Sequence, residues 1–127
     1  MAQAALVDFD IKAGADILDI LDRAKVRVSV AMWAYLGDYE DWRLVLAGRS
    51  LDDRWRTDAY ELVHETLAAA GIRPSKAPTL RIFSMKDPFI VALRRMFGKT
   101  ADVEGMRLGG HVLGDTYLGD AYVYRIK

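Results

Sequence analysis

The fold is decided by residues 26–48, VRVSVAMWAYLGDYEDWRLVLAG, which predict two β-strands joined by a polar turn. Successive side chains of a strand point to opposite faces of a sheet, so the first strand presents two different faces. One face is aliphatic and carries Val26, Val28, Val30, Met32, Ala34 and Leu36. The other face carries Arg27, Ser29, Ala31, Trp33 and Tyr35. This pattern predicts a sheet with one face buried in an aliphatic core. The other face, which mixes aromatic and polar side chains, is predicted to contact a partner that the pattern does not identify.

The rest of the chain predicts helices and strands around this hairpin. Helical spacing of apolar residues and strand alternation define the remaining elements. They are a helix over 11–25, strands over 26–36 and 42–48, a helix over 58–70, a strand over 79–85, a helix over 88–97, and strands over 106–113 and 117–126. The order αββαβαββ predicts a single α+β domain over residues 1–127, with about five mostly antiparallel strands and helices packed mainly on one face.

Local signals mark the ends of two of these helices. Asp87 suits the N-cap position of the third helix, because its carboxylate can accept a hydrogen bond from an orphan amide, and Pro88 suits the first helical position. Gly98 is expected to end that helix. Gly71 suits the left-handed position that ends the second helix.

The register of the first hairpin decides which side chains share its aromatic face. If Leu36 pairs with Trp42, Tyr35 lies opposite Arg43. A slip of one residue would invert that assignment, because the side-chain period of a strand is two.

The last hairpin separates into two faces in the same way. Gly114 and Asp115 make a plausible two-residue turn, and pairing Leu113 with Thr116 places His111 opposite Leu118. The same register places Arg107 opposite Tyr122. Three glycines in this hairpin weaken it or mark bulges: Gly109, Gly110 and Gly119. The two hairpins together predict a partly open face that carries Trp33, Tyr35, Arg43, Arg107, His111, Asp120 and Tyr122.

Three interpretations of this face are open. In the first, a further helix or loop covers it and the polar groups lie at its rim. In the second, it is a self-association interface, because aromatic residues and Arg are enriched at interface anchors. In the third, it binds a small molecule or a nucleic acid, because aromatic rings stack and Arg adds charge.

The sequence gives little support for a catalytic site or a metal site. His111 and Asp120 could form an acid–base pair, but a structural hydrogen bond is favoured because the register makes them diagonal neighbours. Glu61 and Glu65 flank His64, but the HEXXH motif is absent, so a histidine at the core boundary is favoured over a metal ligand. The turn carboxylates Asp38, Glu40 and Asp41 lack EF-hand spacing. The sequence therefore predicts no catalytic residue, no metal site and no cofactor.

The composition limits the classes of binding partner that are expected. The chain has 18 Lys and Arg and 18 Asp and Glu, so its formal net charge is zero, which argues against a whole-surface field for nucleic acid. The densest basic stretch is Arg49, Arg54 and Arg56 with Trp55 between them, but neighbouring aspartates neutralise it. The chain has no Cys, and neither a signal-peptide pattern nor an apolar run of membrane-spanning length, so a cytoplasmic protein is expected.

Two stretches resemble a group of small bacterial proteins of about this size and without an established activity. They are residues 32–48, MWAYLGDYEDWRLVLAG, and residues 114–127, GDTYLGDAYVYRIK. The resemblance extends over the chain from Ala31 onward, and it implies a bacterial cytoplasmic protein but no chemistry. The hypothesis that the sequence favours is a non-catalytic interaction module that forms a homo-oligomer. The alternatives are a small-molecule-binding protein or small enzyme with a pocket beside Trp33, Tyr35 and His111, and a nucleic-acid-binding accessory protein.

Overall fold

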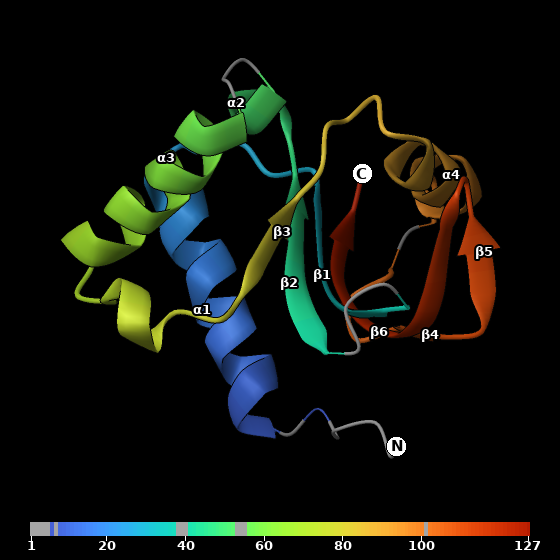
Figure 1. The fold of residues 1–127 in the computed structure, drawn as a ribbon, viewed down its shortest axis with the longest axis horizontal. Coiled ribbons are helices and arrows are strands. Elements are labelled where there is room, and N and C mark those ends of the chain that lie inside the picture. The colour runs from blue at the N-terminus through green and yellow to red at the C-terminus, as the bar shows by residue number, and fades with distance from the viewer. Residues whose placement is uncertain (1–5, 7, 38–40, 53–55, 101) are drawn as a thin grey trace.

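A mixed sheet of six strands lies at the centre of the fold, and helices cover both of its faces (Figure 1). The computed structural model describes residues 6, 8–37, 41–52, 56–100 and 102–127. Its elements are α1 (Asp8–Arg23), β1 (Val30–Leu36), β2 (Trp42–Ala47), α2 (Arg49–Asp52), α3 (Arg56–Ala69), the short 3-10 helix η1 (Pro74–Lys76), β3 (Leu80–Ile82), α4 (Pro88–Phe97), β4 (Arg107–Leu108), β5 (His111–Leu113) and β6 (Thr116–Ile126). The expected α+β class is confirmed.

The strand order is β3-β2-β1-β6-β4, with β5 also paired to β6. The β2–β3 pair is parallel and the other pairs of described strands are antiparallel. Six strands replace the expected five because Gly109 and Gly110 divide one predicted strand into β4 and β5. Gly110 has a φ of +69°, which is outside the strand conformation.

The ends of α4 follow the expected signals. The amide of Phe89 donates to the Asp87 carboxylate over 3.0 Å, and Pro88 occupies the first helical position. Gly98 is the C-cap residue, and its amide donates to the carbonyl of Arg94 over 2.8 Å. The start of α1 was predicted three residues too late, because Asp8 and Asp10 in its first turn complement the helix dipole and lie outside the apolar stripe.

Each face of the sheet has its own core. On the face that α4 covers, here called the α4 face, Val30, Met32 and Ala34 of β1 pack against the helix residues Phe89 and Ile90. All five are fully buried or nearly so.

The opposite face is covered by α1 and α3 and is called the α1–α3 face. Ala31 and Trp33 of β1 pack there with Ile17 and Leu21 of α1 and Val63 of α3. The prediction of helices mainly on one face is therefore wrong. The aromatic face has its own helices over most of its length (Figure 1).

The aliphatic alternation predicted from Val26 onward also breaks. Val26 and Val28 lie in the core that contains Trp33, whereas Val30 lies in the core beneath α4. The reason is that β1 begins only at Val30, so residues 26–29 approach the sheet without keeping the strand alternation.

The first hairpin is one residue away from its predicted register. Tyr35 pairs with Trp42, and Arg43 pairs with Ala34. Tyr35 and Trp42 therefore share the α1–α3 face, where their rings make an edge-on contact with centroids 5.7 Å apart. Arg43 belongs to the α4 face, so its predicted place beside Tyr35 is wrong.

The second hairpin has the register that the sequence predicts. His111 pairs with Leu118, Leu113 with Thr116, and Arg107 with Tyr122. The two-residue turn fixes this register, and Gly114 adopts the required positive φ of +64°.

Candidate interaction surface

A bulge in β6 determines which side chains reach the α1–α3 face at the far end of the sheet. Leu36 of β1 pairs with Leu118 and Tyr35 pairs with Asp120, so Gly119 is an extra residue on β6. Leu118 and Ala121 consequently both point into the core beneath α4. Tyr117 and Asp120, which flank the bulge, therefore share the opposite face.

Two aromatic rings lie on either side of Gly119. A Cβ atom on Gly119 would lie 3.5 Å from the Cδ1 atom of Tyr35 and 3.8 Å from the Cε1 atom of Tyr117. It would also lie 3.2 Å from the carbonyl oxygen of Tyr35, which is tighter than an ordinary contact. The two tyrosines are thus close neighbours above the bulge.

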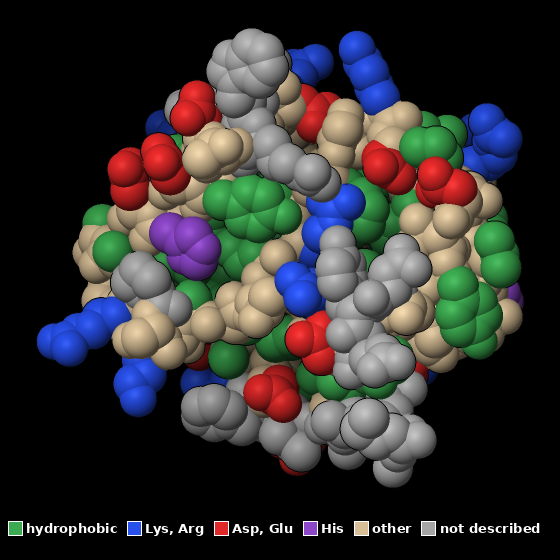
Figure 2. Space-filling view, in the orientation of Figure 1, with side chains coloured by type: hydrophobic (Ala, Val, Ile, Leu, Met, Phe, Trp, Pro, Cys, Tyr) green, Lys and Arg blue, Asp and Glu red, His purple; other side chains and the backbone are tan. Residues whose placement is uncertain are grey.

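The far end of the α1–α3 face carries a cluster of apolar side chains that we call the distal patch. It consists of Tyr35, Trp42, Val112 and Tyr117. Val112 and Tyr117 are direct cross-strand partners, and they are 69% and 52% exposed. Figure 2 shows hydrophobic side chains at the surface on the right of the molecule, over β5. The distal patch is the part of this face that the two helices leave open.

An ion pair borders the distal patch. Nη2 of Arg107 donates to Oδ2 of Asp120 over 2.9 Å, and the amide of Ala121 donates to Oδ1 of the same carboxylate over 2.8 Å. The two charged side chains are 51% and 30% exposed. An ion pair this exposed contributes little stability, typically ~0–1 kcal/mol, so its main effect is on the charge pattern of the surface.

The structure divides the predicted site residues into three groups. Tyr35, Arg107 and Asp120 lie together at or beside the distal patch. Trp33 and Tyr122 lie on the same face beneath the helices, where Trp33 is only 5% exposed.

The remaining two predicted residues lie apart from the distal patch. Arg43 belongs to the α4 face and donates to the Asp41 carboxylate over 3.2 Å. His111 is an exposed residue of β5 opposite Leu118, whose side chain points toward α4. Strand alternation therefore directs His111 to the face opposite Asp120, and the backbone does not bring the two together as an acid–base pair.

Trp33 has a structural role in the covered region. Its indole Nε1 donates to the carbonyl of Asp10 over 3.0 Å, and the hydroxyl of Tyr124 donates to the carbonyl of Ile11 over 2.5 Å. Burial is the main cause that raises the pKa of Tyr124 to about 12. A Cβ atom at Gly14 would lie only 2.8 Å from the Trp33 Nε1 atom, so the absent side chain allows α1 to approach these two rings closely.

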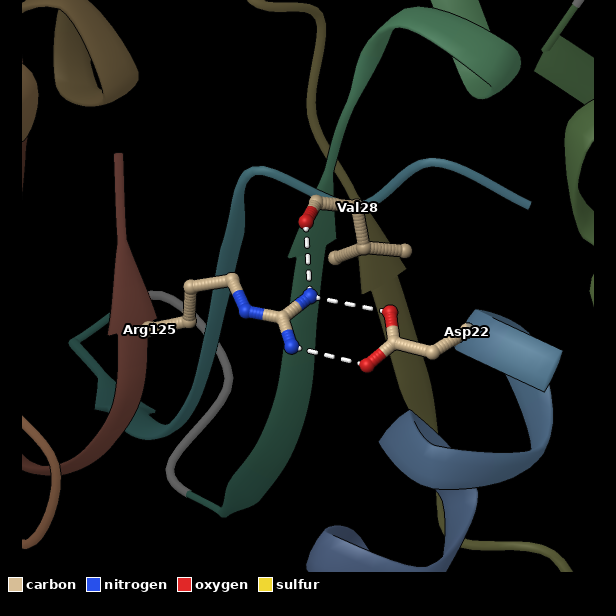
Figure 3. A network of polar contacts seen from close by, with 3 residues as sticks. All are labelled: Asp22, Val28 and Arg125. Atoms are coloured by element: carbon tan, nitrogen blue, oxygen red, sulfur yellow. Dashed lines mark hydrogen bonds and ion pairs between the residues drawn. The ribbon is translucent and has the colours of Figure 1, made fainter. Parts of the chain in front are cut away.

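Sequence analysis missed a second charged group, which joins the end of α1 to β6. Nη2 of Arg125 contacts Oδ2 of Asp22 at 2.8 Å, and Nη1 contacts Oδ1 at 3.0 Å (Figure 3). Nη1 also donates to the carbonyl of Val28 over 3.0 Å. The hydrogen bond from Arg125 holds the pKa of Asp22 below its usual value. No sequence signal connects residues that are 103 positions apart.

This charged group lines a cavity of about 420 Å³ beside the ends of α1 and β6. Other charged residues of the lining are Asp19, Asp102, Glu104 and Lys127. The guanidinium of Arg125 and the carboxylate of Asp22 satisfy each other, so the role of this pair is to join α1, β6 and the segment before β1.

The other predicted candidates do not converge on a site. Arg49 is exposed on α2, and Arg56 begins α3, whereas Arg54, Trp55, Asp38 and Glu40 lie outside the described residues. Nδ1 of His64 is buried, and no described residue provides a hydrogen-bond partner for it. Within the described ranges, no group of three or more His, Cys, Asp or Glu residues could hold a metal ion.

Comparisons with known proteins return no relatives: no family model, no curated protein and no solved structure matches the chain. Among the described helices, none combines the length and the apolar character that crossing a membrane requires. The argument about function therefore depends on the residues of the distal patch and their surroundings.

Proposed function

We propose that this protein is a non-catalytic interaction module that self-associates through the distal patch. The observation that carries the proposal is the exposure of Val112 and Tyr117, a direct cross-strand pair of residues that are 69% and 52% exposed. Next to them lie the half-buried rings of Tyr35 and Trp42. Adjacent exposed apolar side chains at a sheet face are typical of protein interaction sites.

The opposite edge of the sheet is a weaker candidate for association. The outward amide of Ile82 in β3 donates to the hydroxyl of Tyr60 over 2.9 Å. The carbonyl of Ile82 accepts from Nη1 of Arg81 over 2.7 Å. These side chains occupy backbone groups that an added strand would need, which is a common way to protect an edge strand.

Charge supports a second copy of the chain as the binding partner. The equal numbers of basic and acidic residues, 18 of each, give a net charge of zero. Two copies therefore approach without long-range repulsion. Figure 2 shows acidic and basic side chains interspersed over the visible face, without a large field of one sign.

The test is the molar mass in solution as a function of protein concentration, measured by sedimentation velocity. We expect the wild-type chain to form dimers, and Val112→Ser and Tyr117→Ser each to shift the equilibrium toward monomer. Met96→Ser is the matched control, because Met96 is 53% exposed but lies on α4, away from the distal patch. A wild-type protein that stays monomeric at millimolar concentration, or a control that dissociates as readily as the patch variants, would contradict the proposal.

A further inference from the structure

We infer that two copies associate face to face about a two-fold axis that runs along the last hairpin, between β6 and the β4–β5 side. In this arrangement Tyr117 of each copy packs on Val112 of the other, and Arg107 of each copy pairs with Asp120 of the other. The inference rests on the proposed function and adds the geometry and the charged residues that select the partner.

The argument begins with the symmetry of such an interface. A two-fold axis lying in the plane of contact brings each residue against the counterpart of its neighbour across the axis, so the surface must complement itself. The line between β6 and its two hairpin partners separates Val112 from its direct partner Tyr117. It also separates Arg107 from Asp120, although the direct partner of Arg107 is Tyr122 and its side chain reaches Asp120 diagonally, two positions along β6. One axis therefore matches the apolar pair directly, and it matches the charged pair by the same diagonal reach that Arg107 makes within one copy.

The chemistry of the charged pair fits this exchange. Arg107 carries five N–H donors, and its contact with Asp120 within one copy is made through Nη2. With 51% of its side chain exposed, the guanidinium can reach a second carboxylate without leaving the surface. Its carboxylate partner, Asp120, lies opposite Tyr35 in β1, at the border of the apolar cluster. Charges at the rim of an interface mainly determine orientation and partner choice, which is the role inferred here.

Other dimer geometries would bury the apolar residues of the distal patch without bringing Arg107 of one copy to Asp120 of the other. An axis running across the strands through Tyr117 would carry the charged pair of one copy away from that of the other. Such a dimer would still dissociate on Tyr117→Ser, but it would not respond to the signs of residues 107 and 120. Reversal of these signs thus separates the inferred geometry from its alternatives.

The experiment uses the full chain in two charge-reversed forms, Arg107→Asp and Asp120→Arg. Each variant alone places like charges across the axis, so we expect its self-association to weaken by at least about tenfold. In an equimolar mixture every cross-axis contact again joins opposite charges, so a heterodimer should form with near wild-type affinity. Native mass spectrometry identifies the mixed species, and sedimentation velocity gives the dissociation constants.

A matched control reverses an ion pair elsewhere. Arg23 and Asp19 on α1 contact each other at 3.0 Å and are exposed. Arg23→Asp and Asp19→Arg should leave self-association unchanged, alone or mixed. Circular dichroism establishes that each variant is folded. If a reversed variant does not fold, Arg107→Gln and the salt dependence of wild-type association provide the same test, because both weaken a dimer that uses these charges.

The outcomes separate the two proposals. If Tyr117→Ser dissociates the dimer while the charge reversals and their mixture behave like wild type, the inferred axis is wrong and the proposed function stands. If the wild-type chain is monomeric throughout, both are wrong. Loss of association in each reversed variant, with recovery in the mixture, supports both.

Discussion

The ends of α1 and α3 allow a matched test of backbone strain, because the two helices end in the same way with different residues. At the end of α1, the amide of Lys25 donates to the carbonyl of Asp22 and the amide of Val26 to that of Leu21. At the end of α3, the amide of Gly71 donates to the carbonyl of Ala68 and that of Ile72 to Leu67. The second residue after each helix has positive φ, +61° for Lys25 and +93° for Gly71. Lys25 therefore occupies a position that favours glycine.

The expected magnitude follows from two opposing terms. A residue with a Cβ atom in the left-handed region costs ~1–2 kcal/mol, whereas glycine loses ~0.5–1 kcal/mol more conformational entropy on folding. Glycine should therefore be more stable than alanine by roughly 0.5–1 kcal/mol at both positions. At Gly71 a Cβ atom would meet nothing within 4 Å, so the conformational difference is the whole effect there.

The assay is urea unfolding followed by circular dichroism on Lys25→Gly, Lys25→Ala and Gly71→Ala. Lys25→Gly should unfold at a higher urea concentration than Lys25→Ala, by about 0.3–0.7 M for a typical slope. Gly71→Ala should lower the midpoint of wild type by a similar amount. Comparing Gly with Ala at position 25 removes the contribution of the lysine charge near the helix end. If Gly and Ala are equally stable at position 25 while Gly71→Ala has its expected cost, the reasoning about Lys25 is refuted.

Four further predictions concern single substitutions, three at the interface between α1 and the sheet and one at His111. Gly14→Ala should destabilise the protein by ~1–3 kcal/mol in urea unfolding despite the better helix propensity of alanine, because the added methyl group overlaps the rings beneath it; an equal or higher stability would show that α1 can move away without cost. Asp22→Asn should be less stable than wild type near neutral pH, and the difference should disappear as the pH falls below the usual aspartate range. The reason is that the pKa of the Asp22 carboxyl is lower in the folded than in the unfolded protein. The ionised carboxyl therefore stabilises the fold fully above the unfolded pKa, and this stabilisation is lost as the pH falls through the folded pKa. A difference between the two proteins that is independent of pH would contradict this prediction. Trp33→Ala should cost ~3–5 kcal/mol in thermal or urea unfolding, as for other buried aromatic residues. His111→Ala should change stability by less than ~0.5 kcal/mol, because His111 is exposed; a large loss of stability would contradict this and would show that the histidine has a structural role.

Part of the fold could be predicted because its signals are local. The Asp87–Pro88 start of α4 is expressed in adjacent residues, and the register of the last hairpin is fixed by a two-residue turn. The register of the first hairpin was missed by one residue because the five residues between Leu36 and Trp42 allow several pairings. Neither alternation nor composition chooses between them.

The candidate surface was predicted in part for a different physical reason. Aromatic residues on a strand fit an open interface and a covered core equally well, so the sequence could not tell that α1 and α3 bury Trp33. Tyr35, Arg107 and Asp120 were grouped correctly on one face. Val112 and Tyr117 were not among the residues predicted for the open face, because Gly119 was recognised as a possible bulge but its effect on the alternation was not followed through.

The strand order has a consequence for synthesis on the ribosome. β1 lies between β2 and β6, and it is among the first strands to emerge, whereas β6 is the last described strand to do so. Until β6 emerges, β1 has one unpaired edge, and the Arg125 partner of Asp22 is still missing from the nascent chain. An exposed strand edge of this kind can pair with the strands of other chains. The nascent chain is therefore most prone to aggregation before β6 emerges from the ribosome. Ribosome-bound chains that stop before Thr116 should accordingly be more sensitive to protease than chains that extend beyond Ile126.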